Sequence, residues 1–283
     1  MPAPDRPAPD RPDSDRKGAA PRAANLDSLR RRIAALERFS GVGNSGDGSV
    51  APLHVAAVDG HLPWDGIPRS ALHEIAYDAS FGETSHGGAA ATGFAAAVLG
   101  RLAQDTRRAV VWSRRPARGF RPALYGAGLA RFGLKPDQLI LAQAADSQAV
   151  LWSMEECLRS RAVAAVLGEP GQADARARRR LQLAAEDTGV TAVLLLDDRA
   201  SAMPGPAVTR WRISPAPNPG SHAPAWRVEL LKCRGGGRPG EWVLEWHPRG
   251  GNGGDRRHEN SEPAGGFRVV SPLCHGPARR RTG

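Results

Sequence analysis

Apolar stretches alternate with helical patterns through the middle of the chain. The apolar stretches are short enough for strands, and the segments between them are long enough for helices. Continuous apolar strands that alternate with helices predict an α/β fold, in which helices flank a mostly parallel sheet. The expected strands are Leu72–Ile75, Ala109–Trp112, Leu139–Ala142, Ala162–Leu167 and Val190–Leu196, and the expected helices are Gly88–Gln104, Tyr125–Phe132, Ser147–Ser160 and Asp174–Asp187.

The pattern changes after Asp198, where strand-like segments follow one another without helices between them. These segments read TRWRI, AWRVELLKC and EWVLEWH, and a turn rich in glycine separates the last two. Trp242, Leu244 and Trp246 fall on one face of the last segment, so we expect antiparallel strands here. Four of the seven tryptophans lie in this region, either as core residues or as anchors for a partner.

The two ends of the chain differ in composition from the core, which we place at residues 50–247. Residues 1–24 are mainly proline, aspartate, arginine and alanine, and this composition predicts a disordered tail. Residues 248–283 are rich in glycine, proline and arginine and predict a second disordered tail. A small apolar island, GGFRVVSPLC, interrupts that second tail.

A helix is expected at residues 25–40, between the first tail and the core. Asn25 is a suitable N-cap, and an apolar stripe follows on one helical face. An isolated helix of this length is marginal in water, so the stripe needs a surface to cover it. That surface is the core of the same chain, a second copy in self-association, or another protein. The candidate interface residues are Leu26, Leu29, Ile33 and Leu36.

The charge of the chain favours acidic partners. The 283 residues carry a formal net charge of +10, which suits contact with nucleic acid and also favours solubility. One arginine cluster opens the helix expected at Asp174–Asp187. We expect weak, salt-sensitive binding of single-stranded DNA there. A plain charged helix surface is the alternative, because no aromatic residue accompanies the cluster. Its members are Arg176, Arg178, Arg179 and Arg180.

Cysteine usage and hydropathy narrow the possible classes further. The three cysteines are widely spaced and form neither a CxxC pair nor a Cys/His cluster, so we expect neither a zinc site nor a disulfide framework. The first residues lack the apolar run of a signal peptide. No segment approaches the ~18 apolar residues of a membrane helix. We therefore expect a cytoplasmic protein that does not contact a membrane.

The stretch from residue 67 to 90, IPRSALHEIAYDASFGETSHGGAA, has the layout of a phosphate-binding loop. A short strand is followed by a loop with glycine and hydroxyl residues and then by a long helix. A working loop needs a lysine for the terminal phosphates and a serine or threonine for magnesium. Here Thr84, Ser85 and His86 precede two glycines, and no lysine is present. Because His86 is mostly neutral at physiological pH and short, we expect no nucleotide cofactor.

Several longer motifs follow one another along the core in a recognisable order. They are LPWDGIPRSALHEI, LYGAGL, LWSMEECLRS, RRRLQLAAEDTGVTAVLLL, TRWRI and WRVELLKCRGGGRPGEWVLEW. Their order resembles the RecA core, and the motifs themselves resemble the ImuA family, which are RecA-like proteins of bacterial SOS mutagenesis. The resemblance covers roughly Leu26 to His247 and implies a RecA-like core with a mostly parallel sheet.

The resemblance to RecA also indicates which catalytic groups are missing. The second strand of RecA ends in an acid with a glutamate that activates water, and here Ser113 and the arginines after it stand there instead. The central strand of RecA ends in a magnesium-supporting aspartate, and here Gly168 is followed by Glu169. Asp197 and Asp198 end a later strand, where we expect a solvated strand end in preference to a metal site. Without the lysine, the glutamate and the aspartate, phosphoryl transfer is not expected, so the chain is not expected to be an enzyme.

The resemblance to ImuA implies a non-catalytic accessory role in error-prone translesion DNA synthesis during the SOS response. The implied partners are an ImuB-type protein, which is an inactive Y-family polymerase homologue, and an error-prone C-family DNA polymerase. Two alternatives belong to other classes. One is a genuine ATP-dependent recombinase relative, which the missing lysine disfavours. The other is a SulA-like cell-division inhibitor, although SulA-type chains are much shorter.

Overall fold

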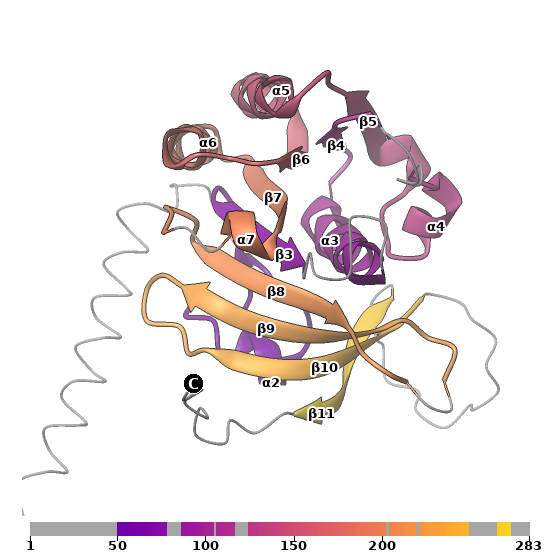
Figure 1. Ribbon diagram of the computed structural model, residues 1–283. Coiled ribbons are helices and arrows are strands. Elements are labelled where there is room, and N and C mark those ends of the chain that lie inside the picture. Colours follow the sequence, from indigo (N-terminus) through magenta and orange to yellow (C-terminus); the bar gives the residue numbers. More distant parts are fainter. Residues whose placement is uncertain are drawn as a thin grey trace, which may run out of the picture.

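The structure is a computed structural model that describes seven stretches of the chain (Figure 1). These stretches are residues 50–77, 86–104, 106–116, 124–201, 204–218, 221–248 and 265–272. The predicted first tail and the predicted helix with Leu26, Leu29, Ile33 and Leu36 lie outside the described residues. Their structure and contacts therefore remain predictions.

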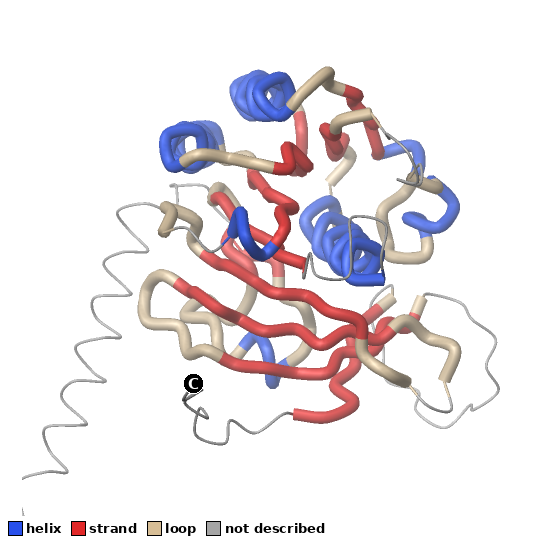
Figure 2. Tube along the Cα trace, viewed as in Figure 1, coloured by secondary structure: helices blue, strands red, loops and turns tan. Residues whose placement is uncertain are grey.

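In the described residues, one sheet of nine strands forms the centre of the molecule, and Figure 2 shows the strands in red. The strand order is β11-β10-β9-β8-β3-β7-β6-β4-β5. The strands from β3 to β5 in this order are parallel, and β8 also runs parallel to β3. The last four strands along the chain pair antiparallel to one another. The predicted α/β class is therefore confirmed. The strands are β3 Leu72–Tyr77, β4 Ala109–Arg114, β5 Leu139–Gln143, β6 Val163–Gly171, β7 Thr191–Asp197, β8 Thr209–Pro215, β9 Ala225–Cys233, β10 Gly240–His247 and β11 Gly266–Pro272.

Helices pack on both faces of the parallel strands, as their apolar runs require. The helix α3, His86–Ala103, packs with α4, Gly126–Ala130, on one face, and its buried Phe94 and Leu99 belong to the larger core cluster. The helices α5, Ser147–Ser160, and α6, Ala175–Thr188, lie against the other face (Figure 1). Each of these two begins at an aspartate whose carboxylate accepts a backbone N–H in the first turn.

Short elements that the periodicity did not reveal complete the fold. Strands β1, Val50–Ala51, and β2, Ile67–Pro68, form a two-stranded ladder beside the large sheet. The helix α2, Ala56–Asp59, lies between them in the chain, and the Asp59 carboxylate accepts the backbone N–H groups of Leu53 and Val55. The remaining short elements are the 3₁₀-helix Pro136–Gln138 and α7, Asp198–Ser201. Two-residue strands carry too few side chains to show a period, so sequence patterns miss them.

The tryptophans of the late strands belong to the core. Trp211, Trp226, Trp242 and Trp246 are all buried on the face of the sheet that α3 covers. Their role as partner anchors, left open by the sequence, is thereby excluded. The indole N–H of Trp246 donates to the carbonyl of Arg131 at 2.7 Å, so burial does not leave it unpaired.

The second predicted tail contains a strand. Residues 266–272 form β11, which pairs antiparallel with β10. The prediction of disorder from residue 248 onward is therefore wrong for this apolar island. The reason is that Phe267 fills a place in the aromatic core, with its ring centroid 5.0 Å from that of Trp246 and 5.6 Å from that of Phe94.

In the part of the chain that the structure describes, none of the helices has the length and apolar character of a membrane span.

A buried histidine joins β3 to β8. His73 is 2% exposed, and its Nδ1 lies 2.7 Å from the hydroxyl of Thr209, while its Nε2 lies 2.8 Å from the carbonyl of Pro68. Because a carbonyl only accepts, Nε2 carries the proton and Nδ1 accepts from the hydroxyl. The hydroxyl also accepts the indole N–H of Trp211 at 2.8 Å. The network is complete only when the imidazole is neutral.

This network predicts a loss of stability in mild acid. Burial lowers the pKa of His73 to about 4, whereas an unfolded histidine titrates near ~6.5. The unfolded state therefore binds more protons between these values, so the contribution of neutral His73 is present above pH ~6.5 and is lost as the pH falls towards ~4. We expect the free energy of unfolding to drop by about 2 kcal/mol from this group between pH 7 and 5.

Urea denaturation at the two pH values measures this difference. The variant His73→Gln should be less stable at pH 7 and should lack this part of the pH dependence. The exposed His222 offers a matched control, and His222→Gln should keep the wild-type difference. An unchanged pH dependence in His73→Gln would show that other groups cause the loss.

Candidate functional site

The carboxyl edge of the parallel strands is the expected position of a ligand in this class of fold. In open α/β sheets, ligands bind where the connections of two adjacent strands leave on opposite faces. Here β4 is followed by α4 on one face, and its neighbour β6 is followed by α6 on the other. The carboxyl ends of these two strands, which we call the crevice, are therefore the expected ligand position.

Side chains at this crevice are bonded to one another. Glu169, at the end of β6, is 5% exposed and accepts the indole N–H of the buried Trp112 at 2.6 Å. Its carboxylate also lies 3.7 Å from the guanidinium of Arg114. Ser113, at the end of β4, shares a hydrogen bond of 2.6 Å with Ser153 of α5. These contacts join strands and helices, so the crevice residues contribute to packing.

The other candidate residues for nucleotide or metal chemistry are those of the loop before α3 and the two acids that follow β7. The loop with Thr84 and Ser85 and the side chain of His86 lie outside the described residues. Asp197 is the last residue of β7 and Asp198 the first of α7. Among the described side chains, no three from histidine, cysteine, aspartate and glutamate come together in a group that could hold a metal ion.

The arginine cluster expected to bind DNA divides into two parts. Arg178 is 1% exposed, and its guanidinium lies 3.2 Å from Glu74, which is itself 0% exposed. The other oxygen of the same carboxylate accepts from Arg210 of β8 at 2.7 Å. Arg178 therefore neutralises a buried acid beneath α6, and its assignment to a DNA surface is corrected. The helical period of 3.6 residues turns this position inward, while the other three arginines point outward.

The other three arginines lie on the outer side of α6. Arg176 and Arg179 are exposed and have no ion pair with any described residue. Arg180 is also exposed, and its Nε lies 2.8 Å from the carboxylate of Glu155 on α5. This contact joins the two helices, which lie next to each other in Figure 1.

A tryptophan shares this surface. Trp152 of α5 is 64% exposed, and Glu155 follows it by three residues, so both lie on neighbouring positions of the helix. Glu155 is the residue that binds Arg180. The sequence shows no aromatic residue within the arginine cluster, and packing of α5 on α6 supplies one. We call this surface the α5–α6 face, and its residues are Trp152, Glu156, Arg159, Arg176, Arg179 and Arg180.

The α5–α6 face has an excess of positive charge. Arg159 forms ion pairs with Glu155 at 3.8 Å and with Glu156. Arg180 makes a second contact with Glu155, so the two glutamates are matched by two arginines. Arg176 and Arg179 remain as excess positive charge at the start of α6. Such pairs at the surface contribute little to stability, and their main effect is on the electrostatic field that a partner meets.

The free edge of the sheet forms a second exposed surface. Strand β5 is the last in the sheet order, and its Ile140 and Leu141 are 52% and 46% exposed. The two side chains point to opposite faces of the sheet, because neighbouring strand residues alternate. None of the described residues covers the free edge of β5. Unprotected edge strands with apolar side chains are typical sites of association with another chain.

Comparison with known proteins identifies the family. No model of a known protein family matches the chain. The chain is 36% identical over 204 residues to Protein ImuA of Caulobacter vibrioides strain NA1000 / CB15N, and the alignment covers 67% of this chain and 80% of that protein. The same values hold for Protein ImuA of Caulobacter vibrioides strain ATCC 19089 / CIP 103742 / CB 15. The chain belongs to the ImuA family. The resemblance seen in its motifs is thereby confirmed.

The two parts of the arginine cluster should respond differently to substitution. In this ImuA-family chain, Arg178→Ala leaves the buried Glu74 with one fewer cation and should lower the free energy of unfolding by about 3 kcal/mol. Arg179→Ala removes an exposed side chain of the same type and should change it by less than about 0.5 kcal/mol. Urea denaturation of both variants checks this. Equal effects would mean that the ion pair beneath α6 does not stabilise the fold.

Proposed function

We propose that the chain is a non-catalytic accessory protein of error-prone translesion DNA synthesis in the SOS response. Membership of the ImuA family supports the setting. The observation that carries the non-catalytic part is the crevice between β4 and β6, where Glu169 binds Trp112 and Ser113 binds Ser153. Groups that process a nucleotide must be free to meet phosphate and metal, and these groups are engaged in packing.

The proposed partners are an ImuB-type Y-family polymerase homologue and an error-prone C-family DNA polymerase. An accessory protein of this kind acts by holding such partners together, so its surfaces matter more than any catalytic group. The family membership supports this choice over a SulA-like cell-division inhibitor. A genuine ATP-dependent recombinase relative would hydrolyse ATP in the presence of single-stranded DNA, and we propose that this chain does not.

Binding of purified partners to the full-length chain tests the proposed function. We expect the chain to co-purify with the ImuB-type protein and, through it or directly, with the C-family polymerase. Leu29→Glu with Ile33→Glu should weaken this binding or self-association, since burial of each side chain is worth roughly 1.5–3 kcal/mol. A control with Arg30→Glu and Arg31→Glu changes charges outside the stripe on the same segment.

Two outcomes would contradict this part of the proposal. If neither polymerase binds the full-length chain, the accessory role fails. If the double substitution lowers the melting temperature strongly while binding is retained, the predicted helix packs on its own core. Light scattering and thermal melting of the same samples separate these cases.

We also propose that the α5–α6 face contacts single-stranded DNA. Proteins that bind single strands without sequence preference combine a positively charged track with aromatic side chains on which bases stack. Arg176 and Arg179 provide positive charge that no described acid neutralises. Trp152 provides an exposed aromatic ring on the neighbouring helix α5. The assignment differs from the sequence-based one, because Arg178 is excluded and Trp152 is added.

Salt dependence of DNA binding tests this surface. Replacement of Arg176, Arg179 and Arg180 by alanine should flatten the slope of log K against log salt by about 2 for a single strand. Trp152→Ala should weaken binding by about tenfold and leave the slope unchanged. Fluorescence anisotropy of a labelled oligonucleotide measures both quantities.

A matched control removes the same charge elsewhere. Arg107, Arg131 and Arg238 are exposed and lie outside the α5–α6 face. Their joint replacement by alanine should alter the slope much less. If both triple variants change the slope equally, the chain binds DNA through its overall charge, and the proposed face is wrong.

A further inference from the structure

A cavity lies at the amino edge of the parallel strands, opposite the crevice described above. Its volume is about 620 Å³, which falls within the range of small-molecule sites. Arg69 precedes β3, Arg108 precedes β4 and Gly189 precedes β7, and all three line it. Because these strands are parallel, their amino ends meet at one edge of the sheet. The cavity is therefore formed by segments that are far apart in the sequence.

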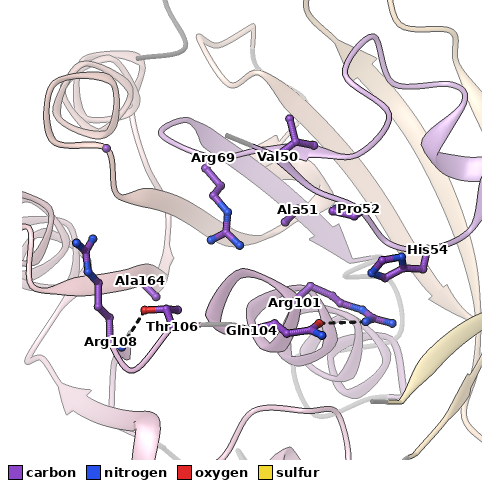
Figure 3. A pocket seen from close by; sticks show the side chains of 11 residues that line it. Val50, Ala51, Pro52, His54, Arg69, Arg101, Gln104, Thr106, Arg108 and Ala164 are labelled. Atoms are coloured by element: carbon purple, nitrogen blue, oxygen red, sulfur yellow. Dashed lines mark hydrogen bonds between the residues drawn. The ribbon is translucent and has the colours of Figure 1, made fainter. Parts of the chain in front are cut away.

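The lining of the cavity is cationic. Arg69, Arg101 and Arg108 contribute guanidinium groups, His54 adds an imidazole, and none of the described lining residues is acidic. Figure 3 shows Arg108 on one side, Arg69 in the middle, and Arg101 with His54 on the other side. The positive groups are thus spread along the cavity. An elongated anion with charge at more than one position would meet several of them at once.

Arg101 is the most buried of these groups, and one of its donors has no partner. It is 5% exposed, and its two terminal nitrogens donate to Gln104 at 3.2 Å and to the carbonyl of Gly265 at 2.7 Å. Its Nε is buried and has no hydrogen-bond partner among the described atoms. Burial lowers the pKa of Arg101, and the charge of Asp59 offsets this only in part. Burying a guanidinium charge is costly unless an opposite charge is near, and an anion in the cavity would offset part of that cost.

Part of the arginine content has a structural explanation. Arg69 donates to the carbonyl of Leu102 at 2.6 Å, near the end of α3. Cations commonly bind the last carbonyls of a helix and favour the negative end of its dipole. This accounts for Arg69, but it does not account for the exposed Arg108 or for the unpaired Nε of Arg101. The inference therefore depends on Arg101 and Arg108.

We propose that this cavity binds a small molecule with two or more linked phosphate groups. Guanidinium groups match phosphate oxygens in charge and in hydrogen-bond geometry. The hydroxyl of Thr106 and the amide of Gln104 offer further polar contacts on the lining. No described aromatic side chain except the imidazole of His54 lines the cavity, so recognition rests on phosphate and not on stacking of a nucleobase. This site is independent of the proposed accessory role.

Titration of the full-length chain with sodium pyrophosphate tests the proposal. Chloride keeps the ionic strength constant, and calorimetry and thermal melting are the readouts. We expect saturable binding that raises the melting temperature, with weaker binding of inorganic phosphate. Arg108→Ala should weaken pyrophosphate binding by about tenfold, as expected for the loss of one charged hydrogen-bonding group. Arg101→Gln should weaken pyrophosphate binding by a similar factor. If Arg101→Gln does not fold, Arg108→Ala by itself tests the proposal.

Two controls locate the bound anion. Arg107 is exposed and adjacent to Arg108 but does not line the cavity, so Arg107→Ala should change the affinity by less than about twofold. The variant with alanine at Arg176, Arg179 and Arg180 should bind pyrophosphate like the wild type. Succinate, which carries two carboxylates, should bind much more weakly than pyrophosphate.

Three results would overturn the proposal. The first is the absence of saturable pyrophosphate binding. The second is an equal effect of Arg107→Ala and Arg108→Ala on pyrophosphate affinity, or loss of binding when Arg176, Arg179 and Arg180 are replaced by alanine. Either outcome would place the anion on the general basic surface. The third is succinate binding as tight as that of pyrophosphate, which would show that the cavity selects carboxylates and not phosphates.

Discussion

Neutralisation of a buried carboxylate at the centre of the sheet holds the two halves of this protein together. Glu74 on β3 has no exposure, and an isolated charge in such a place costs several kcal/mol. Arg178 reaches it from α6 and Arg210 reaches it from β8. One cation comes from the helices over the parallel strands and the other from the antiparallel strands. The two ion pairs therefore fix both parts to the same point of β3.

The two edges of the parallel strands have different characters. At the carboxyl edge, Trp112 and Glu169 bond to each other and Ser113 bonds to a helix, so groups that meet phosphate in a nucleotide-processing fold serve packing. At the amino edge, Arg101 and Arg108 line a cavity without a described acidic neighbour on its surface. A fold whose usual ligand edge is occupied by internal contacts still offers a cationic site at the other edge.

The four arginines at the start of α6 make different contacts. Arg178 faces the sheet, Arg180 pairs with Glu155, and Arg176 and Arg179 face outward without a described partner. Helical geometry alone separates the inward position from the outward ones. The contact of Arg180 with Glu155 joins α6 to the helix that carries the exposed Trp152. Charge and aromatic surface come together only because the two helices pack side by side.

Local patterns along the chain were enough to predict the class of fold and most of its regular elements. Apolar runs and helical periods are local properties, so they located α5 and β9 to the residue and revealed the missing lysine near His86. Which side chains are exposed to a ligand or partner depends on tertiary packing. It buried Arg178 against Glu74, placed Phe267 of a segment predicted to be disordered in the aromatic core, and formed the cationic cavity from segments far apart in the chain. These features depend on contacts between residues distant in the chain, and a local pattern carries no information about which distant groups will meet.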